Sequence, residues 1–243
     1  MGDGRKALKD WIDDGRRIVF FGGAGVSTES GIKDFRSADG LYSMQYKYPP
    51  EEILSHHFFM ENPEEFFRFY RDKMVAPDAG PSGAHLALAE LERQGKLTAV
   101  ITQNIDGLHQ KAGSKNVIEL HGSVLRNTCV RCGKAYTLSD VLKTEGVPRC
   151  VCGGVIKPDV VLYEEALREE DLTAAVKALA GADLLIVGGT SLSVYPAAGL
   201  LHYFRGRRLA LINRTETGFD DRAGLILRDK VGEVLFQAVF GDR

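Results

Sequence analysis

Short apolar runs rich in branched residues alternate with segments of helical periodicity along most of the chain. The runs predict strands at residues 16–23, 96–104, 116–122, 158–164, 182–190, 207–214 and 223–228. Between them, residues 84–95 and 169–182 repeat apolar side chains three and four positions apart, which is typical of helices. Strands without a polar face occur in parallel sheets that helices cover on both sides. The pattern therefore predicts an α/β fold built on a Rossmann-like parallel sheet.

The four cysteines form two close pairs. Two residues separate Cys129 from Cys132, one residue separates Cys150 from Cys152, and seventeen residues lie between the pairs. Four thiolates at such spacings can close a tetrahedron around a zinc ion. Two disulfides are the alternative, but a bridge within Cys-x-Cys is strained and cytosolic thiols stay reduced. Because four thiolates leave no open coordination position, one structural zinc ion per chain is expected.

Two segments interrupt the alternation of strands and helices. Residues 38–80 are rich in aromatic side chains and are predicted to be helical, and residues 124–156 contain the cysteines. We assign both to a smaller lobe, made of a helical insert and a zinc module. The Rossmann-like domain is then expected to comprise residues 1–37, 81–123 and 157–243.

Composition narrows the class of protein. The chain has 243 residues, 44% of them hydrophobic, which is enough to bury a full core. Its formal net charge of -2 gives no field that would attract nucleic acid or an anionic membrane. No apolar run approaches the roughly 20 residues that span a bilayer, and the charged N-terminus has no signal core. We expect a cytoplasmic protein without nucleic-acid or membrane partners.

The first predicted strand runs into a turn of small residues, "GGAGVSTESGIKDFRS" at 22–37. Backbone N–H groups of residues 22–25 could approach a phosphate closely, and a helix N-terminus there would add partial positive charge. This favours a dinucleotide site. However, Thr28 stands where the usual fingerprint has its third glycine, and tight glycine turns also occur for structural reasons. The turn alone leaves both interpretations open.

Polar residues lie at the carboxyl ends of three further predicted strands. Open α/β sheets bind ligands outside these ends, so the polar groups are expected to converge on one crevice. Each also has a structural alternative: Asp106 with Gly107 can be a simple turn, and His121 is one of six histidines. The residues are Gln103, Asn104 and Asp106 after one strand, His121 after the second, and Gly188, Gly189, Thr190 and Ser191 after the third.

As a set, these motifs resemble the sirtuins, the NAD-dependent protein deacylases, of bacterial or archaeal type. The stretch "GAGVSTESGIKDFR" resembles their signature GAGxSxxSGIPDFR, and "TQNIDGLH" matches theirs without change. The segments "LHG", the cysteines, "GTSLSVYPAAG" and "LIN" follow in family order, from about residue 16 to the C-terminus. The chain departs from the family where Lys33 replaces a proline, where Glu164 replaces a glycine, and in its Cys-x-Cys pair, since Cys-x-x-Cys is commoner.

The resemblance implies how NAD would bind. The nicotinamide carboxamide needs one acceptor and one donor, which the Asp106 carboxylate and the Ile105 backbone N–H can supply. Phe35 would shield the reacting ribose carbon from water. The other implied contacts are Ala24, Gly25, Thr28 and Arg36 around the diphosphate, Gln103 and Asn104 at the nicotinamide ribose, and Thr190, Ser191, Asn213 and Val231 at the adenosine half.

The resemblance also implies the reaction. The oxygen of acetyl-lysine would attack the ribose carbon as nicotinamide leaves, and His121 would then accept a proton from the ribose. An imidazole with an ordinary pKa of about 6.5 suits a base near neutrality. His121, which also contacts the cofactor, and Asn104 are the implied catalytic residues. The products would be free lysine, nicotinamide and O-acetyl-ADP-ribose, so NAD is a consumed co-substrate.

The protein substrate is expected to bind along residues 159–165, "DVVLYEE", as an added strand. Val160, Val161 and Tyr163 would wall the channel for the acyl-lysine. Backbone pairing tolerates many sequences, so a broad range of acetylated peptides is expected.

The acyl group is predicted from the aromatic insert. Sirtuins that prefer succinyl or malonyl groups have a Tyr-x-x-Arg pair where this chain has Phe67 and Tyr70. Neither residue can pair with a buried carboxylate. Arg71 lies one residue further, about 100° around a helix, and should point away from the pocket. We expect a preference for acetyl over succinyl.

Three other functions remain open. An NAD-dependent ADP-ribosyltransferase on the same scaffold would label protein instead of releasing O-acetyl-ADP-ribose. A Rossmann oxidoreductase would need an acidic residue after a second strand to hold the adenine ribose, and none is found. A zinc-ribbon binding module for nucleic acid is disfavoured by the near-neutral charge and by the lack of a basic, aromatic stripe around the cysteines.

Overall fold

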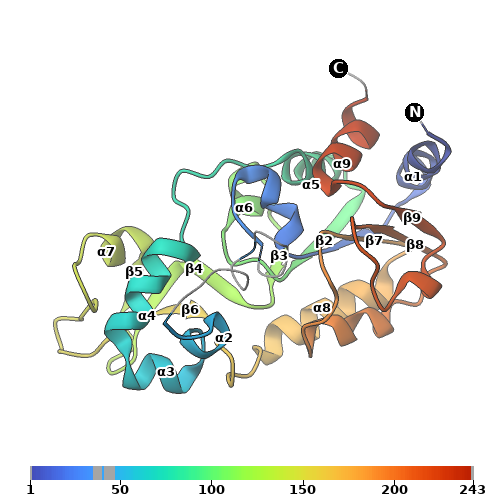
Figure 1. Cartoon of the computed structure of the whole chain (residues 1–243). Coiled ribbons are helices and arrows are strands. Elements are labelled where there is room, and N and C mark those ends of the chain that lie inside the picture. The colour runs from blue at the N-terminus through green and yellow to red at the C-terminus, as the bar shows by residue number, and fades with distance from the viewer. Residues whose placement is uncertain (1, 35–39, 41–46, 242–243) are drawn as a thin grey trace.

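Residues 2–34, 40 and 47–241 are described by the computed structural model (Figure 1). The larger sheet in this part of the chain has six parallel strands in the order β3-β2-β1-β7-β8-β9. These are β1 (Ile18–Gly22), β2 (Leu97–Thr102), β3 (Val117–Glu119), β7 (Leu184–Gly188), β8 (Arg208–Ile212) and β9 (Leu225–Leu227). All six fall within predicted strands, so the Rossmann-like α/β class is confirmed.

Helices cover both faces of this sheet because its strands are apolar on both faces. In β1, Val19 and Phe21 join one buried cluster, and Ile18 and Phe20 join the other. Figure 1 shows α8 on one side of the sheet and α1, α5 and α9 on the other. The covering elements are α8 (Glu169–Gly181) and the 3₁₀ segment η5 (Ala197–Tyr203) on the first face, and α1 (Asp3–Asp14), α5 (Gly83–Arg93) and α9 (Val231–Phe240) on the second.

The strand order reverses at β1. The chain builds outward from β1 to β2 and β3, and then returns to place β7 on the other side of β1. Ligands of open α/β sheets bind at such a reversal, outside the carboxyl ends of the strands. The glycine turns after β1 and β7 therefore flank the expected ligand crevice.

A second, antiparallel sheet lies beside the first, in the order β5-β4-β6 (Figure 1). It comprises β4 (Gly122–Cys129), β5 (Ala135–Thr137) and β6 (Ile156–Val160). This corrects the strand expected at residues 158–164 in the parallel sheet. Its first half belongs to β6 and pairs with β4, because an apolar run does not specify which sheet it joins. The domain boundaries drawn from the sequence stay a prediction.

Aromatic helices pack on this smaller sheet. Phe59, Phe66, Phe67 and Tyr70 are fully buried, and their ring centroids lie 5.0 to 6.1 Å apart in edge and stacked contacts. The helices are α2 (Pro50–Ile53), α3 (His56–Glu61), α4 (Pro63–Phe69), the π-helical turn η4 (Tyr70–Met74), and α7 (Leu138–Leu142) near the cysteines. Among the described residues, none of the helices combines the length and apolar character needed to cross a membrane.

Candidate active site and metal centre

The glycine turn after β1 packs directly against the turn after β7. A Cβ on Gly25 would lie 2.7 Å from the Gly189 Cα, and one on Gly23 would lie 2.9 Å from the Thr190 Cβ. The Gly25 N–H already donates to the Gly189 carbonyl oxygen at 2.8 Å. The Gly25 N–H, which the sequence placed near a phosphate, is thus bonded within the protein. Because Gly25 has no side chain, it instead lets the two turns approach each other closely.

No long helix begins at this turn. The structure has two 3₁₀ turns, η1 (Ala24–Val26) and η2 (Thr28–Ser30), where the sequence suggested a helix N-terminus. Three-residue turns do not build a macrodipole, so the expectation of a partial positive charge at this turn is wrong. Thr28 is exposed, and its hydroxyl donates to the Gly25 carbonyl oxygen at 3.0 Å. Phe35 and Arg36 lie outside the described residues.

The polar residues after β2 meet partners in the turns that follow β1 and β7, as the sheet topology requires. The Gln103 side-chain Nε2 donates to the Thr190 hydroxyl at 3.0 Å. The Ser27 hydroxyl donates to the Asp106 carboxylate at 2.7 Å and accepts from the Asn104 side-chain amide at 3.1 Å. The residues that the sequence placed at separate strand ends therefore lie within hydrogen-bond distance of one another, at the edge of the sheet where the crevice is expected.

Ser27 was missed by the sequence interpretation, although it connects Asn104 and Asp106. It is 1% exposed and lies between the two 3₁₀ turns. The available signal was the serine inside the signature "GAGVS", which we treated as part of a backbone turn. A hydroxyl that donates to one group and accepts from another orders both.

His121 follows β3 at the same edge of the sheet. Its Nδ1 lies 2.9 Å from the Gln103 carbonyl oxygen, and its own carbonyl oxygen accepts from the Val161 N–H at 2.9 Å. Burial lowers the pKa of His121 below its ordinary value, and the hydrogen bond to Gln103 opposes this only in part. His121 is therefore held as a neutral imidazole between the crevice and the segment after β6.

The residues expected at the adenosine half lie at the ends of β7 and β8 and at the start of α9. The Ser191 hydroxyl lies 2.7 Å from that of Ser193, and the Asn213 side-chain amide donates to the Thr215 carbonyl oxygen at 2.9 Å. Val231, the first residue of α9, is 3% exposed and packs against Gly188. All three lie on the carboxyl side of the parallel strands.

The segment expected to bind the peptide leaves β6 and passes His121. Val160 is buried at the end of β6, and Tyr163 is 39% exposed. The Tyr163 N–H donates to the Leu54 carbonyl oxygen at 2.9 Å, and its carbonyl oxygen accepts from the His56 N–H at 3.0 Å. The backbone of this segment is therefore paired with Leu54 and His56 at Tyr163.

Two buried histidines lie behind the crevice. His85 and His109 are both at most 1% exposed, with ring centroids 4.5 Å apart. Burial lowers the pKa of His85 to about 4, against the opposing attraction of Asp106. The His85 Nδ1 accepts from the Ser82 N–H at 3.0 Å, so the ring caps the first turn of α5. These side chains pack beneath the site and support it.

The four cysteines form the predicted cluster. The four sulfur atoms of Cys129, Cys132, Cys150 and Cys152 lie within 4.8 Å of one another, and none is in a disulfide. The sulfurs of Cys129 and Cys152 lie 3.5 Å apart and those of Cys132 and Cys150 lie 3.6 Å apart, close to the roughly 3.8 Å between sulfurs of a tetrahedral zinc site with bonds of about 2.3 Å. The donor set thus fits zinc, and it leaves no position open for substrate.

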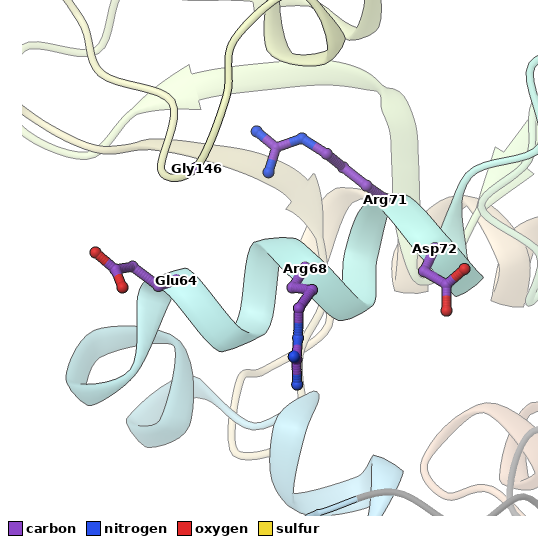
Figure 2. A pocket seen from close by; sticks show the side chains of 5 residues that line it. All are labelled: Glu64, Arg68, Arg71, Asp72 and Gly146. Atoms are coloured by element: carbon purple, nitrogen blue, oxygen red, sulfur yellow. The ribbon is translucent and has the colours of Figure 1, made fainter.

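Two open hollows lie outside this crevice. Figure 2 shows one of about 500 Å³ beside α4, where Arg71 reaches toward the loop at Gly146 and Arg68 points away from it. The Arg71 Nη2 donates to the Thr144 hydroxyl at 3.3 Å, so this guanidinium is engaged with the cysteine module. Phe67 and Tyr70, by contrast, are fully buried.

The other hollow, of about 490 Å³, lies at the amino ends of β1, β7 and β8. Arg17, Arg205 and Arg207 line it, close to the C-terminal ends of α1 and α8. Cationic side chains at helix C-termini offset the helix dipole, which gives these arginines a structural role. The hollow lies at the end of the sheet opposite to the crevice.

Comparison with known proteins identifies the group to which this architecture belongs. The model of the Sir2 family matches residues 23–196, which include the glycine turn, the cysteines and the turn after β7. The chain belongs to the Sir2 family. It is 58% identical to an NAD-dependent protein deacetylase of Cutibacterium acnes over 230 residues, which cover 94% of each chain. A deacetylase of Clostridium perfringens is 55% identical over 243 residues, covering 98% of this chain and 100% of that one.

Solved Sir2 structures share the fold over nearly the whole chain. One holds a Sir2 variant with deacetylated p53 peptide and 3'-O-acetyl-ADP-ribose, and has a TM-score of 0.87 and 44% identity over 95% of each chain. Another Sir2 enzyme has a TM-score of 0.90 and 40% identity, covering 99% of this chain and 98% of its own. The resemblance to the sirtuins is thereby confirmed.

Proposed function

We propose that this Sir2-family chain is an NAD-dependent protein lysine deacetylase, which transfers the acetyl group of acetyl-lysine to ADP-ribose and releases nicotinamide. The observation that carries the proposal is the convergence of His121, Gln103 and the Ser27–Asp106 pair at the reversal point of the sheet. The bacterial relatives named above are deacetylases at 55% and 58% identity. NAD supplies both the leaving nicotinamide and the ribose that accepts the acetyl group.

The crevice offers different chemistry along its length for NAD. Asp106 would accept from the nicotinamide carboxamide, and the Ile105 N–H would donate to it. Gln103 and Asn104 would hold the adjoining ribose. The further contacts proposed are Ala24, Gly25, Thr28, Phe35 and Arg36 near the diphosphate and reacting ribose, and Thr190, Ser191, Asn213 and Val231 at the adenosine half.

His121 would act as the general base. Its Nδ1 has a carbonyl oxygen as partner and carries the proton, so the lone pair is on Nε2. The lowered pKa keeps this nitrogen unprotonated at neutral pH. His121 would then accept a ribose proton at Nε2, while Asn104 holds the same ribose in place.

The acetyl-lysine peptide would bind along the segment after β6 as an added strand. The channel that leads to His121 would be lined by Val160, Val161 and Tyr163. The Val161 N–H donates to the His121 carbonyl oxygen at 2.9 Å. Main-chain pairing gives affinity without reading much sequence. Acetylated proteins of varied sequence are therefore the proposed substrates.

Zinc would be structural. Cys129, Cys132, Cys150 and Cys152 would hold it at the far end of β4, which begins right after His121 and ends at Cys129. Free thiols of this kind persist in a reducing compartment, which supports a cytoplasmic location.

One assay separates this function from its alternative. The chain is incubated with NAD and an acetylated peptide, and nicotinamide is measured with and without each substrate. We expect nicotinamide release only when both are present, because acetyl-lysine is the nucleophile. An ADP-ribosyltransferase would instead consume NAD with the unacetylated peptide and would leave label from adenine-labelled NAD on protein.

A further inference from the structure

Glu164 adopts a backbone conformation that side chains rarely take. Its φ is +76°, in the left-handed region that favours glycine. A glycine would adopt this conformation without strain, whereas the Cβ of Glu164 opposes it. Because Glu164 lacks the conformational freedom of glycine, another interaction must stabilise the turn.

The side chain of Glu164 makes the interactions that stabilise this turn. Its carboxylate accepts from the His57 backbone N–H at 3.1 Å and lies 2.7 Å from the His57 Nδ1. The His57 N–H, and then its imidazole, keep the pKa of Glu164 below the ordinary range. Glu164 therefore binds the first turn of α3 through two contacts, both with His57.

The next residue makes a parallel contact. The Glu165 carboxylate lies 2.8 Å from the His56 Nδ1, and it accepts from the Leu162 N–H at 2.9 Å and from the Lys157 Nζ at 3.0 Å. We call the two pairs, Glu164 with His57 and Glu165 with His56, the double clasp. It joins consecutive residues after β6 to consecutive residues of α3.

The double clasp holds the segment that borders the catalytic histidine. Val161 donates to the His121 carbonyl oxygen, and Tyr163 pairs through its backbone with Leu54 and His56. Residues 161–165 are thus fixed at one end to His121 and at the other to α3. A turn that relaxed at Glu164 would release the end of the segment that is bonded to α3 and would disorder residues 161–165.

The exposure of the His57–Glu164 pair indicates that it affects the order of the segment rather than the stability of the whole protein. The His57 and Glu164 side chains are 54% and 50% exposed, and an ion pair this open contributes little to global stability. An apparent dissociation constant, however, rises in proportion as the binding-competent population falls. Loss of the clasp should therefore weaken peptide binding without unfolding the protein.

We propose that Glu164 and His57 are positioning residues for the acetyl-lysine peptide, which preform segment 161–165 without the glycine found in the family signature. The proposal rests on the proposed function, because it assigns the peptide to this segment. Neither side chain is required to touch NAD or the reacting atoms.

The test compares steady-state constants of matched variants. Glu164→Ala keeps the strained turn and removes the pair, so it should raise the peptide KM about tenfold, while kcat and the KM for NAD stay within about twofold. Glu164→Gly removes the pair but relieves the strain, and should fall between Glu164→Ala and wild type. Glu164→Gln still accepts from the His57 N–H and should remain within about twofold of wild type.

His57→Ala removes the imidazole contact but keeps the backbone N–H that donates to Glu164, so its peptide KM should lie between those of wild type and Glu164→Ala. The double variant should show no loss beyond that of Glu164→Ala, because Glu164→Ala already removes both contacts. Asp13→Ala, which breaks the comparably exposed Lys9–Asp13 pair on α1, should leave the peptide KM unchanged. If Glu164→Ala does not fold, His57→Ala and Glu164→Gly make the same comparison.

A peptide KM within about twofold of wild type in both Glu164→Ala and His57→Ala would overturn the proposal, as would equal rises in the KM for peptide and NAD. Failure of the proposed function would be distinct, because the wild-type chain itself would then lack NAD-dependent deacetylation.

Discussion

The Nδ1 of His121 lies 2.9 Å from the backbone carbonyl oxygen of Gln103. A carbonyl oxygen can only accept, so the imidazole proton is on Nδ1 and the lone pair is on Nε2. The contact also ties the end of β2 to the residue that follows β3. Two neighbouring strands thereby set both the position and the tautomer of the proposed base.

Replacing His121 tests its role as the base. We expect His121→Ala to lower kcat by 10²-fold or more, the usual scale for a general base, while NAD still binds. NAD affinity measured by calorimetry should change little, because most proposed contacts with NAD lie elsewhere. His202→Ala removes an exposed histidine that pairs with Arg222 and should leave kcat unchanged. Near wild-type deacetylation by His121→Ala would show that the base is misassigned.

The pH profile follows from the lowered pKa of His121. The protonated imidazole cannot accept a proton, so activity should fall as pH drops through that pKa. Because burial lowers the pKa, the acid limb of kcat/KM should have its midpoint below about 6.5 and the profile should be flat from there to about pH 8. A midpoint above about 6.5 would contradict a neutral, buried base.

Buried His85 should limit stability in acid. Its pKa of about 4 in the folded chain is below the roughly 6.5 of an unfolded histidine, so the unfolded state binds the proton first as pH falls. The stability that this histidine contributes is complete above about pH 6.5 and is lost between there and about pH 4. Chemical denaturation should show this slope, and it should flatten in His85→Gln. An equal slope in both proteins would exclude His85 as its cause.

Zinc should hold the cysteine module together. Metal analysis of protein purified without chelator should find about one zinc per chain, and chelation or Cys150→Ala should unfold the module and lower activity indirectly, because metal-binding energy in such a module is largely folding energy. Val151→Ala is the matched control, since Val151 lies between two of the cysteines and is 91% exposed. A zinc content well below one, or a fully stable Cys150→Ala, would speak against a four-thiolate site.

The acyl preference can be measured on one peptide. The chain should turn over acetyl-lysine at least about 100-fold better than succinyl-lysine in kcat/KM, since buried Phe67 and Tyr70 offer no cation to a carboxylate. Arg71 is engaged with Thr144, so Arg71→Ala should leave this ratio unchanged. Equal or better use of succinyl-lysine, lost in Arg71→Ala, would place that guanidinium in the pocket.

Much of the fold could be predicted because local pattern specifies it. The helices at Gly83–Arg93 and Glu169–Gly181 follow from their period, and β1 and β7 from runs that are apolar on both faces. The run at 158–164 has the same local character as these strands. Its pairing with β4 depends on contacts such as Gly122 with Val160, far apart in sequence, which no local pattern encodes.

The candidate site was predictable where polar residues end strands. Gln103, Asp106 and His121 share this placement, and the topology then brings them together. Ser27 escaped notice because its partners come from another strand. The contacts of Glu164 escaped for the same reason, since His57 lies 107 residues away in the chain.

The fate of the acetyl group tests the central claim most directly. A peptide with an isotopically labelled acetyl-lysine is incubated with the chain and NAD, and the products are separated and identified by mass spectrometry. The account predicts that the label leaves as O-acetyl-ADP-ribose, with one molecule formed for each nicotinamide released and each lysine freed. Label recovered as free acetate, or ADP-ribose attached to protein in place of O-acetyl-ADP-ribose, would contradict it.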